Sequence, residues 1–510
     1  MRKPACFGTM RRMLKSALAR SRRTQPLLLA PLLALLLASC GGHGGERRLA
    51  LHECRLPKFP TAAQCGTLEV AEDRSRPEGR HIGIGVVLFP ANTLDPRPDP
   101  LFLIPGGPGQ SVDALASLVG AFADVRRKRD LVLVDPRGTG RSAPLECAAL
   151  KERDPFDELT DLEAANSAPR RCLAELTAQG KVDLTQYTTS AVVADLDAVR
   201  VALGYARINL WGGSYGTRVA QEYLRRHPEQ VRSVVLDGVA PPALNISIDL
   251  WPSREAALAD VLAACAADTV CHEAYPDLRA TLERIRERLG ARRRIAVGDP
   301  RTGRVHEIAL SFDTVVGALQ ALTYSPELSS VIPPLLARAD AGDFAPLLAA
   351  GLLFAADLSR TMNLALQYTV ICTEEAPRAT SDAAERAFAG LLAPALARRY
   401  RAACEGWPRA ALPADFNAPL VSDKPVLLLS GGLDPVTAPA LGELVARTLS
   451  NSRHVVATGY GHIVSLHACA PQLIEKFVDE AGFRSLPQSC LDYFAASRRP
   501  PLFDSLLESR

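Results

Sequence analysis

Short, continuously apolar runs separated by glycine-rich and polar segments dominate the hydrophobic pattern of this chain. Leu131-Val132-Leu133-Val134 is an example in which every residue is apolar. Such runs predict strands that are buried on both faces, as in parallel sheets covered by helices. The runs of this kind begin near residues 101, 131, 207, 232, 425 and 453. Two earlier segments, 66–70 and 81–88, predict an antiparallel opening of the same sheet.

Between residues 240 and 423 the pattern changes to stretches rich in alanine and leucine. Their spacing predicts helices over 254–267, 278–289, 328–338 and 383–399. The chain has 510 residues, which is enough for a full core and an additional module. We therefore predict an α/β fold, a mostly parallel doubly wound sheet with an inserted helical cap. The sheet domain is expected over 61–239 and 424–510, and the cap over 240–423.

A candidate nucleophile follows the run that begins near residue 207. Gly212-Gly213-Ser214-Tyr215-Gly216 lies between this predicted strand and a helix-compatible stretch over 217–226. Small residues are needed where a strand turns sharply into a helix and presents a serine hydroxyl to solvent. A glycine-rich turn with an incidental serine would give the same five residues, so the assignment of Ser214 depends on partners elsewhere in the chain.

Two such partners follow later strands. Asp434 comes after the run 424–430, and His462 comes after the run 453–457, in each case on a glycine-containing loop. The resulting chain order Ser, Asp, His is that of α/β-hydrolases and differs from the chymotrypsin and subtilisin orders. His454 is the nearest competitor for the base, but it opens its strand, so we prefer His462.

A fourth loop can stabilise an oxyanion. The predicted strand 101–104 ends in Pro105-Gly106-Gly107-Pro108-Gly109, where glycines allow backbone N–H groups to approach a ligand closely. Gly107 is our choice for one donor, with Gly106 as the alternative. The N–H of Tyr215, the residue after the nucleophile, is the second donor. A plain turn between a strand and a helix is the competing interpretation.

Four motifs together resemble the prolyl iminopeptidase and tripeptidyl aminopeptidase group of α/β-hydrolases. They lie at 105–109, 134–142, 211–217 and 235–242, and the resemblance extends from about residue 66 to residue 486. It implies an α/β-hydrolase fold and a serine aminopeptidase that releases N-terminal proline or short di- and tripeptide units through an acyl-enzyme. Prolyl iminopeptidases usually carry His before the paired glycines, whereas this chain has Pro105, which is more similar to the exported tripeptidyl branch.

The resemblance also implies an anchor for the substrate amine. The stretch 370–377 is similar to a Cys-x-Glu segment of the family, and its acidic residue corresponds to Glu374, with Glu375 as the alternate. An exposed acidic helix start is an equally good interpretation of these residues. Two other functions stay open: an esterase or lipase, because the triad does not distinguish esters from amides, and a non-catalytic surface binding protein on a hydrolase scaffold.

The start of the chain predicts export. Residues 1–39 contain eight Lys or Arg and no Asp or Glu. The basic residues precede an apolar run over 26–38, which is too short to span a membrane. Its end, Leu37-Ala38-Ser39-Cys40-Gly41, resembles a bacterial lipobox, which implies lipidation of Cys40 and anchoring to a bacterial membrane on its periplasmic or cell-surface side. An ordinary secretory signal with a chance cysteine is the alternative. Residues 40–60 are expected to form a tether.

Cysteine content and charge restrict the remaining chemistry. Removal of residues 1–39 lowers the formal net charge from +3 to −5, so nothing favours a polyanionic partner such as nucleic acid. No Cys-x-x-Cys or similar ligand spacing predicts a metal, and the mechanism requires no cofactor. Of the twelve cysteines, Cys6 lies in the predicted signal and Cys40 is expected to carry the lipid, which leaves ten, an even number that predicts disulfides in an exported chain. We expect sequential pairing: Cys54–Cys65, Cys147–Cys172, Cys265–Cys271, Cys372–Cys404 and Cys469–Cys490.

Overall fold

The computed structural model describes residues 49–499, apart from residue 60 and the segments 152–155, 157–161, 290–292 and 379–401. The predicted signal sequence, Cys40 and the predicted helix over 383–399 therefore lie outside the described residues.

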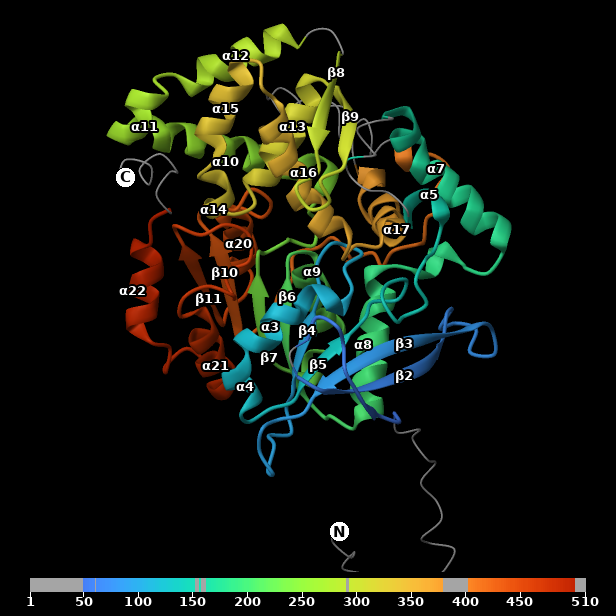
Figure 1. The fold of residues 1–510 in the computed structure, drawn as a ribbon. Helices are drawn as coiled ribbons and strands as arrows, with labels where there is room; N and C mark the ends of the chain where they lie inside the picture. The colour runs from blue at the N-terminus through green and yellow to red at the C-terminus, as the bar shows by residue number, and fades with distance from the viewer. Residues whose placement is uncertain are drawn as a thin grey trace, which may run out of the picture. The chain divides into compact units, whose positions relative to one another are not determined.

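A nine-stranded sheet runs through the centre of the structure (Figure 1). Its order is β1-β2-β3-β5-β4-β6-β7-β10-β11. Strands β1, β2 and β3 are antiparallel to their neighbours, whereas β5, β4, β6, β7, β10 and β11 are parallel to one another. The strands are β1 (His52–Cys54), β2 (Ala63–Ala71), β3 (His81–Phe89), β4 (Leu101–Ile104), β5 (Leu131–Val134), β6 (Ile208–Gly213), β7 (Val231–Asp237), β10 (Val426–Gly431) and β11 (Ser452–Ala457).

Every predicted strand of the sheet is present close to its expected position, and the fold class is confirmed. One boundary is wrong, because β1 lies inside the range 40–60 that we assigned to a tether. The chain therefore joins the sheet from residue 52 onward, where His52 pairs with Cys65 and Cys54 with Ala63.

Helices cover both faces of the sheet, which explains why its strands are apolar throughout. In β5, Val132 and Val134 pack into one buried cluster and Leu131 and Leu133 into the other. The first cluster includes α8 (Thr189–Leu203), α9 (Tyr215–Arg226) and α20 (Pro439–Ala446). The second includes α3 (Ala116–Ala121), α4 (Ala123–Arg126), α21 (Ala470–Glu480) and α22 (Gln488–Ala496). Between β5 and α8 lie α5 (Ala148–Lys151) and α7 (Leu162–Gln179).

The cap lies beyond the ends of the parallel strands and has an apolar cluster of its own (Figure 1). Its helices are α10 (Ile246–Ala267), α11 (Thr269–Ala274), α12 (Leu278–Arg288), α13 (Phe312–Leu322), α14 (Pro326–Ser329), α15 (Ile332–Asp340), α16 (Ala345–Ser359) and α17 (Leu364–Glu374). The cap is mainly helical, as predicted, but it also contains two strands that the sequence analysis did not predict. Strands β8 (Arg293–Gly298) and β9 (Val305–Leu310) form an antiparallel hairpin within it.

All five expected disulfides are formed, with Cα–Cα distances between 5.0 and 5.8 Å. Each closes a local loop; Cys265–Cys271, for example, joins α10 to α11, and Cys469–Cys490 joins α21 to α22. In the described part of the chain, the helices are too short or too polar to cross a membrane.

Candidate active site

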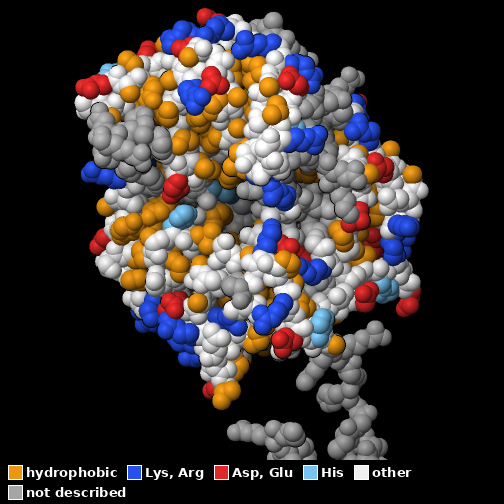
Figure 2. All heavy atoms as spheres, viewed as in Figure 1, with side chains coloured by type: hydrophobic (Ala, Val, Ile, Leu, Met, Phe, Trp, Pro, Cys, Tyr) orange, Lys and Arg blue, Asp and Glu red, His pale blue; other side chains and the backbone are white. Residues whose placement is uncertain are grey.

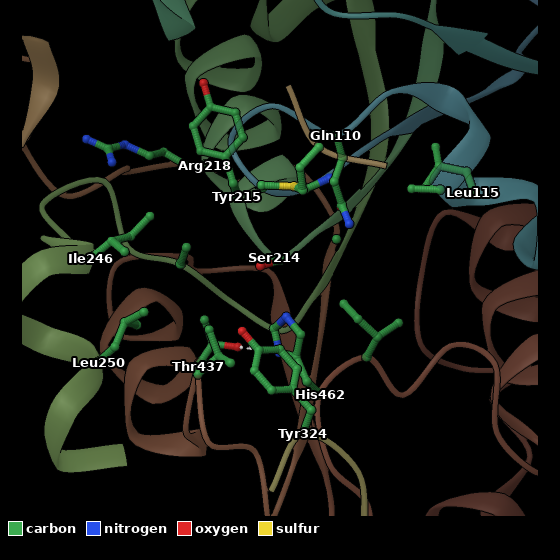
Figure 3. Close-up of a pocket in the computed structure, with 18 of the residues that line it drawn as sticks. Gln110, Leu115, Ser214, Tyr215, Arg218, Ile246, Leu250, Tyr324, Thr437 and His462 are labelled. Atoms are coloured by element: carbon green, nitrogen blue, oxygen red, sulfur yellow. Dashed lines mark hydrogen bonds between the residues drawn. The ribbon is translucent and has the colours of Figure 1, made fainter. Parts of the chain in front are cut away.

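Ser214 occupies the turn between β6 and α9, as the sequence predicts. Its backbone has φ 55° and ψ −123°, a conformation that non-glycine residues rarely adopt. The flanking glycines are required because the backbone approaches itself closely. A Cβ on Gly212 would lie 2.3 Å from the carbonyl oxygen of Gly216, and one on Gly216 would lie 2.3 Å from that of Ile104. The strained turn places Ser214 in the wall of a pocket (Figure 3).

Asp434 and His462 meet at the carboxyl ends of β10 and β11. His462 Nδ1 lies 2.9 Å from Asp434 Oδ2, and the carboxylate is buried. Figure 3 shows the imidazole ring below Ser214 on the same pocket, with a ring nitrogen towards the hydroxyl. The structure thus brings the three predicted residues together. His454, the competitor, instead contacts Ser430 Oγ through Nε2 at 2.9 Å and does not line this pocket.

The environment of His462 favours its protonated form. Burial alone would lower the pKa of the imidazole, but the nearby charge of Asp434, its hydrogen bond and the more distant Asp237 outweigh burial, so the pKa lies above its usual value. Burial opposes ionisation of Asp434 as well, yet His462 and backbone N–H groups hold the pKa of that carboxyl below its usual range. The pair is therefore arranged to stabilise an imidazolium next to Ser214.

Three residues that the sequence analysis missed hold this pair in place. Thr437 Oγ1 donates to Asp434 Oδ2 at 2.8 Å and lies 3.3 Å from His462 Nδ1. Asp237, at the end of β7, accepts from the N–H groups of Val464 and Ser465 and so fixes the loop after His462. Tyr324, from the cap, contacts the imidazole edge to face, with ring centres 5.9 Å apart.

Of these three residues, only Thr437 and Asp237 had a feature in the sequence that could have indicated their role. Thr437 follows Asp434 by three residues, a spacing at which an aspartate accepts hydrogen bonds from the following turn. Asp237 ends a predicted strand, like the triad loops. The contribution of Tyr324 depends on how the cap sits on the sheet, which no local pattern reveals.

The loop after β4 contains the two glycines considered as oxyanion donors. Gly106 N–H donates to Gln110 Oε1 at 3.1 Å and is therefore occupied. Gly107 N–H has no acceptor among the described residues, and Gly107 lines the pocket. Tyr215 is the first residue of α9, where helix geometry leaves the N–H without an intrahelical partner. Of the two glycines that we considered, the structure favours Gly107.

Glu374 and Glu375 lie together but do not reach the pocket. Glu374 accepts from Thr189 N–H at 2.6 Å and from its hydroxyl at 2.8 Å. Glu375 accepts from Arg218 Nη1 at 2.9 Å and from Ile246 N–H at 2.6 Å. Both are fully buried, and the pocket lining contains Arg218 in their place. Their predicted contact with a substrate amine stays a prediction.

Burial is the main influence on the pKa values of these two glutamates. It raises the pKa of Glu375 to about 7, although Arg218 and the N–H of Ile246 oppose the shift. The pKa of Glu374 is also raised by burial, against the opposing effect of Arg218. The glutamates therefore form a buried cluster with Arg218, which itself reaches the pocket.

The pocket lies between the sheet domain and the cap, is partly open to solvent and has a volume of 370 Å³. Figure 2 shows a hollow between these two parts, with hydrophobic side chains on one side and Lys and Arg side chains on the other. The cap contributes apolar residues to the lining, among them Leu244, Ile246 and Leu250. It also contributes Arg254 and Tyr324. In the part of the chain that the structure describes, no group of His, Cys, Asp and Glu side chains has the arrangement of a metal site.

Comparison with known proteins agrees with this geometry. Residues 99–266 match the family model for the alpha/beta hydrolase fold, and residues 392–490 match the model for TAP-like protein. The serine protease Hip1 of Mycobacterium tuberculosis is 33% identical over 201 residues, which cover 36% of this chain and 37% of that protein. The tripeptidyl aminopeptidase of Streptomyces lividans is 33% identical over 197 residues, which cover 36% of this chain and 37% of that protein.

A third relative is named for a different activity. Carboxylesterase B of Mycobacterium tuberculosis is 33% identical over 307 residues, which cover 55% of this chain and 56% of that protein. These matches span between 37% and 56% of the relatives' own lengths. Among solved structures, the chain is similar to a proline iminopeptidase of Mycobacterium smegmatis at 17% identity, with a TM-score of 0.40 over 81% of this chain and 98% of that one.

Proposed function

This chain belongs to the α/β-hydrolases and carries a TAP-like C-terminal region, and we propose that it is a serine aminopeptidase that releases N-terminal proline or short di- and tripeptide units from peptides. The observation that carries the proposal is the Asp434–His462 hydrogen bond of 2.9 Å in the pocket that also exposes Ser214. The names of two relatives, a serine protease and a tripeptidyl aminopeptidase, support a peptide substrate.

The proposed mechanism uses the geometry of the pocket directly. His462, oriented by Asp434, takes the proton of Ser214 as the hydroxyl attacks the scissile carbonyl carbon. The N–H groups of Gly107 and Tyr215 hold the oxyanion that develops on the carbonyl oxygen. The protonated imidazole then gives its proton to the leaving amine, and an acyl-enzyme on Ser214 remains. Water, deprotonated by the same imidazole, resolves it and releases the N-terminal unit.

The pH dependence follows from the protonation of His462. The base must be neutral in the free enzyme, and the pKa of His462 is raised. The acid limb of kcat/KM is therefore expected to have its midpoint above the ordinary histidine value of about 6.5. A pH–rate profile with a tripeptidyl anilide measures it, and a midpoint below that value would contradict the role of the Asp434 charge.

Replacement of Ser214 tests the proposal itself. Ser214→Ala should abolish turnover of peptide anilides and labelling by a fluorophosphonate probe, while the unfolding temperature and circular dichroism stay those of a folded protein. Ser111→Ala, outside the lining of the pocket, is the matched control. Hydrolysis retained by Ser214→Ala would end the assignment. A wild-type protein that no fluorophosphonate labels would favour a binding protein on a hydrolase scaffold.

Carboxylic ester hydrolysis is the second candidate. Two observations favour it: the match to carboxylesterase B covers more of this chain than the peptidase matches do, and the lining residues that the structure describes include no carboxylate that could hold an amine. The free-amine requirement rests on the family resemblance of Glu374 and Glu375. Hydrolysis of tripeptidyl amides that is lost when the amine is blocked would support the aminopeptidase. Equal hydrolysis of blocked amides and simple esters would support the esterase.

Export and anchoring belong to the same proposal. The lipobox-like sequence before Cys40 supports lipidation of that residue and attachment to a bacterial membrane. The five disulfides support an oxidising compartment. Cys40→Ser should move the protein from the membrane fraction to the soluble fraction of the exported material. Cys6→Ser, within the predicted signal, should leave the distribution unchanged. A membrane fraction that is the same for wild type and Cys40→Ser would contradict lipidation.

A further inference from the structure

The charged residues that line the pocket are unusual for a site expected to hold an ammonium group. Apart from the imidazole of His462, the charged side chains in the lining are those of Arg218 and Arg254. The remaining described residues of the lining are apolar, glycine or uncharged polar residues, and none of these is Asp or Glu. A substrate group with negative charge fits this lining better than a positive one does.

Arg218 has its charge compensated outside the pocket. Its guanidinium donates to Glu375 Oε1 at 2.9 Å and has a carboxylate oxygen of Glu374 at 3.8 Å. The side chain is 3% exposed, and the ring of Phe416 lies under it at 5.2 Å. Arg218 is therefore held within the buried cluster by Glu375, although its Nε and Nη2 also lack a hydrogen-bond partner among the described residues.

Arg254 has no such compensation. Its Nη1 donates to the neutral side-chain oxygen of Gln320 at 3.4 Å, and its guanidinium lies 5.0 Å from the ring centre of Trp251. Among the residues that the structure describes, no carboxylate pairs with Arg254. Its Nε is buried without a hydrogen-bond partner, and Nη2 has none among the described residues either.

The unpartnered atoms have a particular geometry. Nε and Nη2 form one edge of the planar guanidinium, and their two N–H bonds are parallel, which is the arrangement that binds a carboxylate through two hydrogen bonds. The other edge is held by Gln320, and one face by Trp251, so the orientation of the group is fixed by contacts in the cap. The free edge belongs to a side chain that lines the same pocket as Ser214.

We propose that Arg254 determines specificity for substrates whose released N-terminal unit carries a carboxylate side chain, an aspartate or a glutamate. This inference rests on the proposed peptidase function. The unit that is acylated on Ser214 must occupy the pocket below α10, where the carboxylate accepts two hydrogen bonds from Nε and Nη2 of Arg254. The bonds are charge-assisted and satisfy a donor that is otherwise buried and unpaired, so both partners gain from the contact.

The test compares glutamate with glutamine, which have nearly the same shape. Tripeptidyl 4-nitroanilides with Glu or Gln at each of the three positions, the others being Ala, are assayed with the wild-type chain. We expect kcat/KM to favour Glu over Gln by about tenfold at one position, the contribution of one charge-assisted contact. Arg254→Met should bring this ratio close to one. Arg254→Lys, which keeps the charge but loses the two-donor edge, should give an intermediate ratio.

A matched control separates a local effect from the general charge of the cap. Arg286→Met removes an exposed arginine of α12 that does not line the pocket, and it should keep the wild-type ratio. A Glu-to-Gln ratio near one at every position, or a ratio that Arg254→Met leaves unchanged, overturns the inference.

Failure of the inference and failure of the proposed function give different results. Hydrolysis of the all-alanine anilide without any preference for Glu overturns the specificity alone. If no anilide is hydrolysed, the peptidase proposal fails. Calorimetry of the same tripeptides as C-terminal amides, bound to the Ser214→Ala protein, then decides the inference. Equal affinity for the Glu and Gln peptides overturns it, and tighter binding of the Glu peptide that requires Arg254 supports the carboxylate site.

Discussion

The two walls of the pocket differ in how completely their buried polar atoms are hydrogen-bonded. On the side of the sheet, Asp434 accepts hydrogen bonds from two backbone N–H groups, Thr437 and His462, so its oxygens are satisfied. On the side of the cap, Arg254 and Gln320 retain buried donors without partners, and so does Arg218 of α9, which pairs with Glu374 and Glu375 of the cap. A satisfied network is rigid and suits a reaction that every substrate undergoes, whereas unpaired donors are available for a group that only some substrates carry.

The largest effect is expected on the wall formed by the sheet. Asp434→Asn preserves the shape of the side chain but removes the charge that stabilises the imidazolium and can leave the imidazole in the wrong tautomer. We expect kcat to fall by about 10⁴-fold for all substrates alike, with little change in KM. Steady-state kinetics with neutral and acidic anilides measure both constants. A fall of less than about tenfold, or one confined to a single class of substrate, would place Asp434 outside the catalytic machinery.

The sequence predicted this wall well because its geometry is local to the strands. Ser214, Asp434 and His462 follow apolar runs, and the carboxyl ends of parallel strands meet at one edge of a sheet. Each disulfide also joins cysteines that are close in sequence, so sequential pairing succeeded. Gly107 was distinguishable from Gly106 only in the structure, because the side chain of Gln110 occupies one of the two N–H groups.

The wall formed by the cap was predicted poorly, since its features depend on tertiary packing. Glu374 and Glu375 were expected in the pocket, but Thr189, Arg218 and Ile246 occupy their oxygens. The hairpin β8–β9 was missed although β9 alternates buried and exposed residues, because helical spacing dominates the sequence on both sides. No pattern pointed to Arg254, which is one of many arginines in the cap.

The second prediction concerns the buried cluster behind the cap wall. Burial raises the pKa of Glu375 to about 7 in the folded protein, above its value in the unfolded chain. A carboxyl with a raised pKa favours folding most at low pH, and this contribution is lost as the pH rises through the folded pKa. The wild type should therefore lose about 3 kcal/mol of stability relative to Glu375→Gln between roughly pH 4.5 and pH 7.5.

Urea unfolding at several pH values measures this difference. Glu229→Gln, which replaces a glutamate with 84% of its side chain exposed, is the control and should show no such trend. If Glu375→Gln instead becomes less stable relative to wild type as the pH rises, the ionised Glu375–Arg218 pair stabilises the fold, and Glu375 titrates below its ordinary range.

The third prediction returns to the sheet and asks how much the surrounding network contributes. Thr437→Val keeps the volume of the side chain but removes the hydroxyl that donates to Asp434. One hydrogen bond to a charged group contributes about 1.5 kcal/mol, so kcat should fall by about tenfold, again equally for all substrates. Thr448→Val, whose hydroxyl donates to the carbonyl of Leu420 away from the pocket, should leave kcat unchanged. Equal rates for Thr437→Val and wild type would mean that the backbone N–H groups suffice to orient Asp434.

The smallest effect is expected for Gln320, which touches Arg254 but does not line the pocket. Gln320→Met conserves volume and removes the acceptor that holds Nη1, so Arg254 becomes free to rotate away from the bound carboxylate. We expect the Glu-to-Gln preference to fall by about threefold, because a hydrogen bond as long as that between Nη1 and Gln320 is worth about 1 kcal/mol or less. Stability should change little, because loss of the 3.4 Å contact to Nη1 is offset by removal of the buried Nε2 of Gln320, which has no partner. A kcat that falls equally for Glu and Gln substrates would show that the two walls are coupled, and the division between reaction and recognition would then be wrong.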